Sequence, residues 1–270
     1  MKKSLLYILA VLVGSLLFGA CDKHDSASDP APNSYSEFFI NPPSFNTPSG
    51  SKVYWDDDGL WWSPSGDLVL INGNMYQIIK GTDPNTGATQ WKTAGGRQTY
   101  KVDGNFYCCY IGQTTQSTTW DAENKIYHNV NLTNIVPLVG ESRDNKMTLK
   151  PCCAVLKIIN LDCKIDNINF PSLGKNKFRL AGDLDPVNAV VKNTPSGSSF
   201  NVESFADIMP DANGTAYVIM PMAVNQCATR GAVTITYTIN DIQYTKATRS
   251  SVTINKGYVY VIDFAQLQGN

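Results

Sequence analysis

The feature that most constrains the fold of this 270-residue chain is a series of short apolar runs joined by two-residue turns. Asn72-Gly73 separates the two runs of DLVLINGNMYQII, and Asp103-Gly104 separates those of TYKVDGNFYCCYI. Asn-Gly and Asp-Gly are strong hairpin signals because both residues can adopt a positive φ angle. In GAVTITYTINDIQYTKAT, apolar residues alternate with threonines up to Asn240-Asp241, as in a half-buried strand that then turns back. These patterns predict antiparallel hairpins.

The rest of the chain continues this pattern. Further strands are predicted over Met147 to Asn160 with a break at Pro151, Lys164 to Phe170, Thr215 to Met220, Ser250 to Ile254 and Gly257 to Phe264. No long segment has the helical period, and only 17% of the residues are charged, a composition that favours strands and turns over helices. We therefore expect an all-β protein built of antiparallel sandwiches.

The amino-terminal segment has the features of an export signal. Lys2 and Lys3 precede an apolar run from Leu5 to Leu17, which is shorter than the roughly 20 residues of a membrane-spanning helix. Gly19-Ala20-Cys21 then resembles the end of a bacterial lipoprotein signal, in which residues 1–20 are removed and the Cys21 sulfur receives a diacylglycerol. With a further acyl chain, such as palmitate, on the amino group, this lipid would anchor the protein stably in a membrane. The alternative is an ordinary secreted chain.

The mature chain is long enough for one large β domain or two of ordinary size. Residues 21–50 are predicted to be a flexible tether that includes, at most, a first strand at SEFFI. The charged stretch GESRDN then separates two groups of strands, which predicts one sandwich over 51–145 and a second over 146–270. Within the tether, Asp25-Ser26-Ala27 resembles a short O-glycosylation site used on exported Bacteroidetes proteins, so Ser26 is a candidate for modification.

The sequence contains few signs of nucleic-acid binding or catalysis. A net charge of −1 gives no reason to expect nucleic acid as a partner. Sequences of the G-x-S-x-G, Walker A, G-x-G-x-x-G and H-E-x-x-H types are absent. The chain has two histidines: His24 in the tether, and His128, which we expect on a strand as a surface or edge residue. We predict no enzyme activity, no catalytic residues and no cofactor, although two carboxylates on different strands, as in a glycosidase, could not be recognised from sequence.

Metal binding is also not expected. The run Asp56, Asp57, Asp58 lacks the alternate spacing and the later glutamate of a calcium loop, which favours a solvated turn. The six cysteines after Cys21 contain no C-x-x-C pair, and the members of a vicinal pair on a strand point to opposite faces. They are Cys108, Cys109, Cys152, Cys153, Cys163 and Cys227. Two alternatives stay open for them, namely up to three disulfides or buried free thiols.

A tryptophan cluster suggests one binding surface. Trp55, Trp61 and Trp62 in WDDDGLWWSPSG would stack on sugar rings if they were exposed. Packing within the first sandwich is the favoured interpretation, because adjacent Trp61 and Trp62 cannot face the same way on a strand.

The order of the segments resembles the fimbrillin family of Bacteroidetes surface lipoproteins, which includes subunits of type V pili. The resemblance is carried by the signal ending at Cys21 and by five segments: GDLVLINGNMYQI, VNLTNIVPLVGESRDNKMTLKPCCAVLKIINLD, IDNINFPSLGKNKFRLAGDLD, AYVIMPMAV and TINKGYVYVIDF. It implies two tandem transthyretin-like, Greek-key β-sandwich domains without catalytic activity. It also implies an outer-membrane, surface-exposed location, or a fimbrium if the subunits polymerise.

In shaft subunits of that family a protease removes the first strand after an arginine, and the open groove accepts a strand from the next subunit. This is β-augmentation. The resemblance suggests an acceptor groove near the carboxyl-terminal strand, with Tyr258, Tyr260, Ile262 and Phe264 on one side. The partners would be other pilus subunits or copies of the same chain, the outer membrane through the lipid, and host or microbial surface glycans or proteins.

This chain departs from the shaft pattern because its first arginine is Arg97, far beyond a first strand. Either a different protease cuts, with Lys52 as the candidate site, or the subunit keeps its lipid as an anchor, a tip or a surface protein that never polymerises. The alternative from another class is a monomeric glycan-binding lipoprotein of a polysaccharide-uptake system, based on the tryptophan cluster and the tether. A third alternative is a secreted hydrolase.

Overall fold

The computed structural model describes residues 32–41, 43, 45–46, 52–53, 66–112, 116–133, 135–174, 177–192 and 201–269. Asn33–Asn270 form one compact unit, which is the part described below. Cys21, Ser26, the three aspartates from Asp56 to Asp58 and the tryptophans Trp55, Trp61 and Trp62 lie outside the described residues. In the described part of the chain, no helix is long and apolar enough to cross a membrane.

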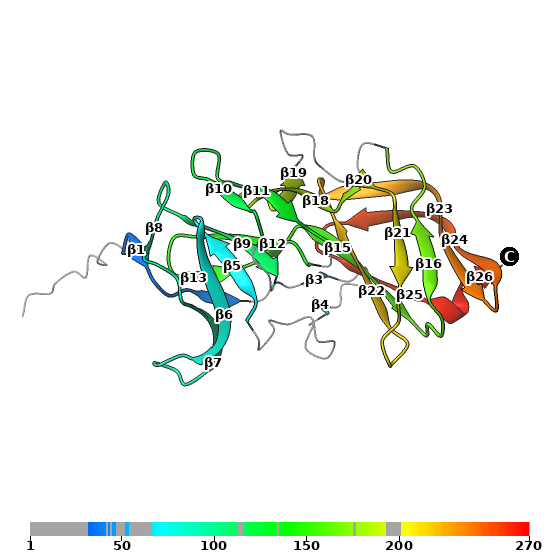
Figure 1. The fold of residues 1–270 in the computed structure, drawn as a ribbon, viewed down its shortest axis with the longest axis horizontal. Coiled ribbons are helices and arrows are strands. Elements are labelled where there is room, and N and C mark those ends of the chain that lie inside the picture. Colours follow the sequence, from blue (N-terminus) through cyan, green and yellow to red (C-terminus); the bar gives the residue numbers. More distant parts are fainter. Residues whose placement is uncertain are drawn as a thin grey trace, which may run out of the picture. The chain divides into compact units, whose positions relative to one another are not determined.

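The largest sheet contains eight strands (Figure 1). In spatial order they are β13 (Lys146–Thr148), β2 (Phe39–Asn41), β7 (Thr89–Ala94), β6 (Asn74–Thr82), β5 (Leu68–Ile71), β9 (Phe106–Gly112), β12 (Leu138–Ser142) and β14 (Lys150–Pro151). The two outermost strands, β13 and β14, are consecutive in the chain, so the segment 146–151 borders both ends of the sheet. One face buries a cluster that includes Phe38, Ile40, Tyr76 and Phe106.

The predicted hairpin at Asn72-Gly73 is confirmed. β5 and β6 pair from Leu68–Gln77 to Ile71–Asn74, and both turn residues have positive φ. The Asn72 side chain fixes the turn, since its Nδ2 donates to the Tyr100 carbonyl at 2.8 Å and its Oδ1 accepts from the Tyr107 amide at 2.8 Å.

The turn at Asp103-Gly104 also forms, but the predicted hairpin is only a single bridge between Val102 and Asn105. The strand before it, β8 (Thr99–Tyr100), pairs instead with β1 (Ser34–Tyr35) near the start of the compact unit. A turn signal fixes the local reversal, whereas the partner of a short strand depends on distant residues.

A second sheet packs against the first. Its order is β10 (Thr119–Asp121), β11 (Ile126–Asn131), β18 (Ala181–Asp185) and β19 (Val190–Lys192). The interface contains Leu70, Tyr127, Val130 and Leu184. Because both faces of β9 are covered, the adjacent cysteines enter different clusters, Cys108 one and Cys109 the other.

The remaining strands form a sandwich of two sheets (Figure 1). The three-stranded sheet has the order β22 (Ala216–Pro221), β15 (Cys153–Ile159) and β25 (Val259–Asp263). The five-stranded sheet has the order β21 (Ser204–Ile208), β16 (Ile165–Asn169), β23 (Gln226–Ile239), β24 (Ile242–Asn255) and β26 (Gln268–Gly269). Leu156, Ile168, Phe170 and Ile235 lie in the shared core.

Short elements complete the described structure. Two small ladders join β3 (Phe45–Asn46) to β4 (Lys52–Val53) and β17 (Phe178–Arg179) to β20 (Asn201–Val202), and η1 (Phe264–Gln266) is a single 3₁₀ turn. Phe45 packs with Val155 and Val259 on the side of the three-stranded sheet that faces away from the sandwich core.

The all-β prediction is confirmed, and the chain forms multiple sheets packed face to face. One strand boundary was wrong: Pro151 is paired with Leu138, and the breaks fall at Leu149 and Cys152. Proline is tolerated there because β14 is an edge strand. The division into two domains between residues 145 and 146 stays a prediction. Along the chain, the strands change from the eight-stranded to the three-stranded sheet between β14 and β15. However, β18 and β19, which come later in the chain, belong to the sheet of β10 and β11.

The structure distinguishes between the two alternatives for the cysteines, which were disulfides and buried free thiols. All six described cysteines are free, and every one except Cys163 is buried. Burial raises the pKa of Cys152 to about 12 and that of Cys227 to about 11. These thiols therefore act as small apolar core residues rather than as nucleophiles.

Candidate functional site: an apolar groove between two strand edges

Among the described residues, β25 leaves one edge without a strand partner, and β24, the strand before it in the chain, leaves most of one edge unpaired. β25 pairs with β15 on one side only, in a parallel ladder from Val155–Val259 to Ile159–Asp263. β24 pairs with β23 along its length, but with β26 only at Lys246 and Ala247. Unpaired strand edges carry backbone donors and acceptors that another strand can satisfy.

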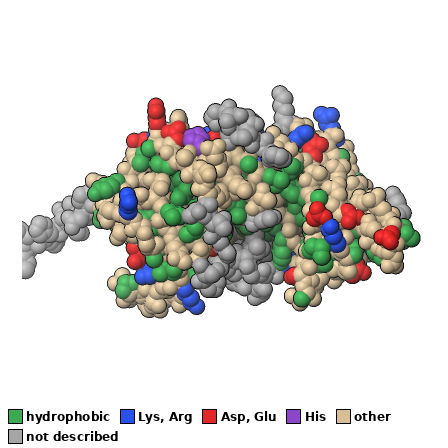
Figure 2. Space-filling model, viewed as in Figure 1, with side chains coloured by type: hydrophobic (Ala, Val, Ile, Leu, Met, Phe, Trp, Pro, Cys, Tyr) green, Lys and Arg blue, Asp and Glu red, His purple; other side chains and the backbone are tan. Residues whose placement is uncertain are grey.

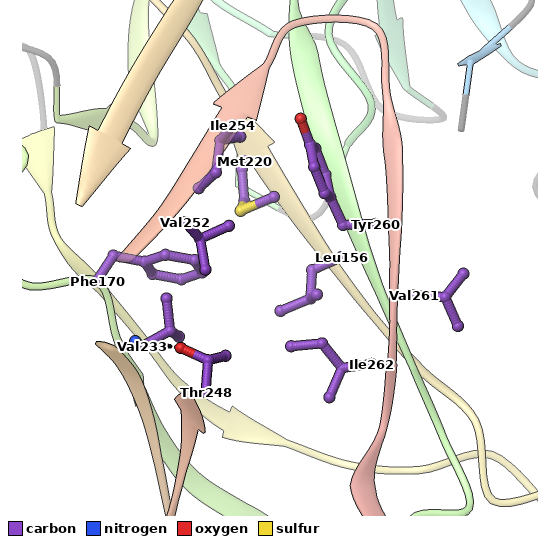
Figure 3. Close-up of a pocket in the computed structure, with 10 residues that line it drawn as sticks. All are labelled: Leu156, Phe170, Met220, Val233, Thr248, Val252, Ile254, Tyr260, Val261 and Ile262. Atoms are coloured by element: carbon purple, nitrogen blue, oxygen red, sulfur yellow. Dashed lines mark hydrogen bonds between the residues drawn. The ribbon is translucent and has the colours of Figure 1, made fainter. Parts of the chain in front are cut away.

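An apolar cavity of about 170 Å³ lies between these edges (Figure 3). The buried side chains of Leu156 of β15, Met220 of β22 and Phe170 form its floor. The side chains drawn in Figure 3 converge on it from both sheets, except that of Val261, which points to the other side of β25. The complete lining is Leu156, Phe170, Met220, Val233, Thr248, Val252, Ile254, Tyr260, Val261 and Ile262. The cavity therefore exposes the core of the sandwich at its open side.

No charged residue lines this groove, and its two hydroxyls are already bonded. Thr248 Oγ1 accepts from the Val233 amide at 3.0 Å and donates to the Ser250 carbonyl at 2.8 Å. The Tyr260 hydroxyl accepts from the Asn255 amide at 2.7 Å. The groove thus offers apolar surface and backbone groups, which suits an uncharged extended segment better than a polar small molecule.

The direction of the β25 backbone shows which groups face outward. The Val155 amide donates to the Tyr258 carbonyl at 2.9 Å. In a parallel ladder alternate residues bond to a given neighbour, so Tyr258, Tyr260 and Ile262 direct their backbone groups toward β15. The backbone groups of Val259, Val261 and Asp263 face the open edge.

Two structured ends bound the groove. At one end η1 is capped by Asp263, whose Oδ1 accepts from the Ala265 amide at 3.1 Å. Lys246 Nζ lies 4.2 Å from the centre of the Phe264 ring and donates to the Phe264 carbonyl at 2.7 Å. At the other end the Gly257 amide donates to the Cys153 carbonyl at 2.7 Å. These contacts hold the edge strands apart at fixed positions.

Two of the four residues predicted for the acceptor groove line the cavity. Tyr260 and Ile262 point into it, whereas Val261 points to the opposite side of β25 and is 53% exposed (Figure 3). Phe264 is buried in η1 beside the groove, packed against Tyr237 at 5.1 Å between ring centres. Tyr258 is not part of the lining, and its ring lies 6.3 Å from that of Tyr260.

Sequence reasoning missed the other wall of the groove. Val252 and Ile254 alternate along β24, which was a usable signal, but nothing local shows that β24 and β25 border one cavity. Lys52 lies on β4, opposite Asn46 of β3, and its role as a cut site stays a prediction.

Neither metal binding nor catalysis gains a candidate here. Within the described ranges, no three His, Cys, Asp or Glu residues are grouped so that they could hold a metal ion. His128 lies on β11, as predicted, but on an inner strand of its sheet. Figure 2 shows basic and acidic side chains scattered over the visible face rather than gathered into one patch.

The sequence and the fold can each be compared with those of known proteins. No family model matches the sequence, and no curated protein matches it. Two similar solved structures, from Bacteroides ovatus and Bacteroides uniformis, are each described as a "putative cell adhesion protein". Both are 14% identical with a TM-score of 0.45, and they cover 87% of this chain and 94% and 97% of their own chains.

A third similar structure is a tip fimbrial protein from Porphyromonas gingivalis. It is 11% identical with a TM-score of 0.29, and the alignment covers 76% of this chain and 91% of that one. Cell adhesion and fimbrial proteins are the kinds of protein that the resemblance to fimbrillins implies.

Proposed function

We propose that the protein is a non-enzymatic, fimbrillin-like cell-surface lipoprotein that serves as a structural or accessory subunit of adhesive pili. Its groove between β24 and β25 accepts a β-strand from another subunit or from a second copy of the chain. The observation that carries the proposal is the cavity of about 170 Å³, lined by uncharged residues, between the open edge of β25 and the part of the β24 edge that β26 leaves unpaired in the described structure.

The groove suits an incoming strand on two counts. The outward backbone groups of Val259, Val261 and Asp263 supply one side of a new ladder. Every second side chain of that strand would face the floor formed by Leu156, Phe170 and Met220, where apolar side chains are favoured. Backbone pairing therefore supplies affinity, and the cavity supplies specificity.

The amino-terminal strands support an anchor or tip role. Phe38 and Ile40 are buried in the core of the eight-stranded sheet, and β2 pairs with both β13 and β7. Loss of the chain up to Lys52 would also withdraw Phe45 from its cluster beside β15. Removing large buried side chains costs several kcal/mol each, which favours a subunit that keeps this segment together with its lipid on Cys21.

The first test is an unheated denaturing gel of the native cell-surface fraction, blotted for this protein beside a boiled sample. We expect a ladder that collapses to one band on boiling, because strand-exchanged subunits are held by many backbone hydrogen bonds and a buried apolar face. Sequencing the amino terminus of the boiled band then tests whether the chain begins at Cys21 or after Lys52. One band of monomer size in both lanes would contradict assembly by strand insertion and would favour a tethered monomer that binds glycans or a weakly held anchor subunit.

A further inference from the structure

Away from the groove, His128 lies between two carboxylates from the two strands that flank it. Its Nδ1 is 2.8 Å from Asp183 Oδ2 of β18, and its Nε2 is 3.5 Å from Asp121 Oδ2 of β10. The side chains of His128 and Asp121 are 26% and 27% exposed, whereas that of Asp183 is only 3% exposed. One imidazole therefore connects three adjacent strands and reaches both a buried and a half-buried carboxylate.

The local backbone is shaped around this contact. The register of β11 against β18 shifts between Tyr127 and Val130, and Asn129 within the shift has φ of 59°. The Asn129 amide donates to Asp183 Oδ1 at 3.1 Å, so the buried carboxylate uses both of its oxygens on neighbouring residues of β11. Such a bulge re-aims a side chain, and here it directs His128 toward Asp183.

The other charged groups nearby have partners of their own. Lys192 of β19 stands opposite Asp183 in the ladder, but its Nζ binds Asp185 at 2.6 Å. Lys125, in the turn between β10 and β11, pairs with Asp103. Glu123 lies in the same turn, where its amide is capped by Asp121. His128 is thus the basic side chain that the described structure places between Asp121 and Asp183.

The β18–β19 hairpin, which His128 contacts through Asp183, is distant in sequence from β10 and β11. β18 and β19 follow the sandwich strands β15 and β16 in the chain, yet they complete the sheet of β10 and β11. Their turn is fixed at its far end as well, because Lys256 Nζ donates to the Ala189 carbonyl at 2.6 Å. Besides its backbone ladder with β11 and its buried residues Leu184 and Val191, the β18–β19 hairpin is held by side-chain contacts that include those of His128 and Lys256.

We propose that His128 is a pH-sensitive clip that fastens the β18–β19 hairpin to the β10–β11 hairpin when the imidazole is protonated and loosens it when the imidazole is neutral. Only the imidazolium has two N–H donors, one for each carboxylate. The neutral ring keeps one donor, and its hydrogen bond to Asp183 of β18 weakens because it loses the charge assistance of the imidazolium. Its other nitrogen then presents a lone pair to the Asp121 carboxylate, and the attraction to β10 is lost.

The pKa shifts agree in direction with this geometry. Burial lowers the pKa of His128, but the hydrogen bond and charge of Asp183, followed by those of Asp121, outweigh burial and raise it above its ordinary value. Hydrogen bonds from the Asn124 side chain and amide, with a smaller one from His128, lower the pKa of Asp121 to about 2. Because the His128 pKa is raised on folding, the clip is fully closed below the unfolded-state pKa of about 6.5. It opens as the pH rises through the folded-state pKa.

Amide hydrogen exchange of the folded chain at pH 6 and pH 8, corrected for the intrinsic rate, tests the proposal. A His24→Gln background leaves His128 as the single histidine, so its imidazole signals also report its titration directly. We expect the opening of residues 126–131 and 181–185 that permits amide exchange to be about fivefold more frequent at pH 8 than at pH 6. A change of about fivefold corresponds to the stabilisation that a salt bridge between partly exposed groups provides. The same comparison over β23 and β24 should show no change.

Two variants separate the clip from general pH effects. His128→Gln keeps a donor but cannot titrate, and it should abolish the pH dependence. Asp121→Asn keeps the turn-capping oxygen but removes the charge, so it should weaken the pH dependence of exchange. This variant supplies the test if His128→Gln does not fold. A His128 pKa at or below its unfolded value, or equal opening at both pH values in the unchanged protein, would overturn the proposal. So would an undiminished pH dependence in a folded His128→Gln variant.

Discussion

At the scale of single residues, five of the six described cysteines are core residues. Cys108 and Cys109 occupy opposite faces of β9, and Cys152 and Cys153 likewise lie in different clusters. Vicinal cysteines on a strand buried on both faces behave as small apolar side chains. Their number therefore reflects core composition and not a disulfide framework.

Thiol reactivity distinguishes Cys163 from the other cysteines. It is half-buried, whereas Cys108, Cys109, Cys152, Cys153 and Cys227 are buried. In the folded chain with Cys21→Ser, we expect a neutral thiol reagent to modify Cys163 first and the buried five only on unfolding. Mass spectrometry against reaction time measures this, and Cys163→Ser should remove the early adduct. Rapid modification of two or more thiols in the folded protein would contradict the packing described here.

At the scale of elements, the groove depends on the turn that joins its two edge strands. Gly257 adopts φ of 78° in that turn, a conformation that side chains with a Cβ rarely adopt. Its amide also bonds to the Cys153 carbonyl. The positions of β24 and β25 relative to β15 are therefore tied to one glycine.

Replacing Gly257 tests this dependence. Gly257→Ala should lower the free energy of unfolding by about 1 kcal/mol or more, because alanine is strained at positive φ. Gly231→Ala is the matched control, since Gly231 has no positive φ of this kind and an added Cβ would meet only Pro171 at an ordinary 3.6 Å. Chemical denaturation measures both, and equal effects of the two substitutions would argue against strain at Gly257.

The sequence predicts elements better than their partners. The hairpins at Asn72-Gly73 and Asn240-Asp241 follow from local turn chemistry, and the structure confirms them. The pairing of β18 with β11, and the parallel pairing of β25 with β15, join residues far apart in the chain. For the same reason the alternation of GYVYVIDF could place Tyr260 and Ile262 on one side of a strand, where the resemblance to fimbrillins suggested a groove, whereas nothing in the sequence pointed to Leu156, Phe170 and Met220.

At the scale of the whole molecule, the chain combines a folded β unit with an apolar groove and a predicted lipid on Cys21. The lipid, the tether and the tryptophan cluster remain predictions from the sequence. The groove, by contrast, is built from described residues of β15, β22, β24 and β25. We propose that subunits assemble through that groove.

The most direct test of this claim compares Ile262→Lys with Val261→Lys in the unheated gel of the cell-surface fraction. Both residues are among those that line the groove, but Ile262 points into it, whereas the exposed side chain of Val261 points to the other side of β25 (Figure 3). A lysine at 262 would place a charge where an apolar strand must insert, which is costly, so the ladder should be lost while the monomer still folds. Val261→Lys should leave the ladder intact. A ladder that survives Ile262→Lys in full, with both variants folded and exported equally, would contradict strand insertion at this groove.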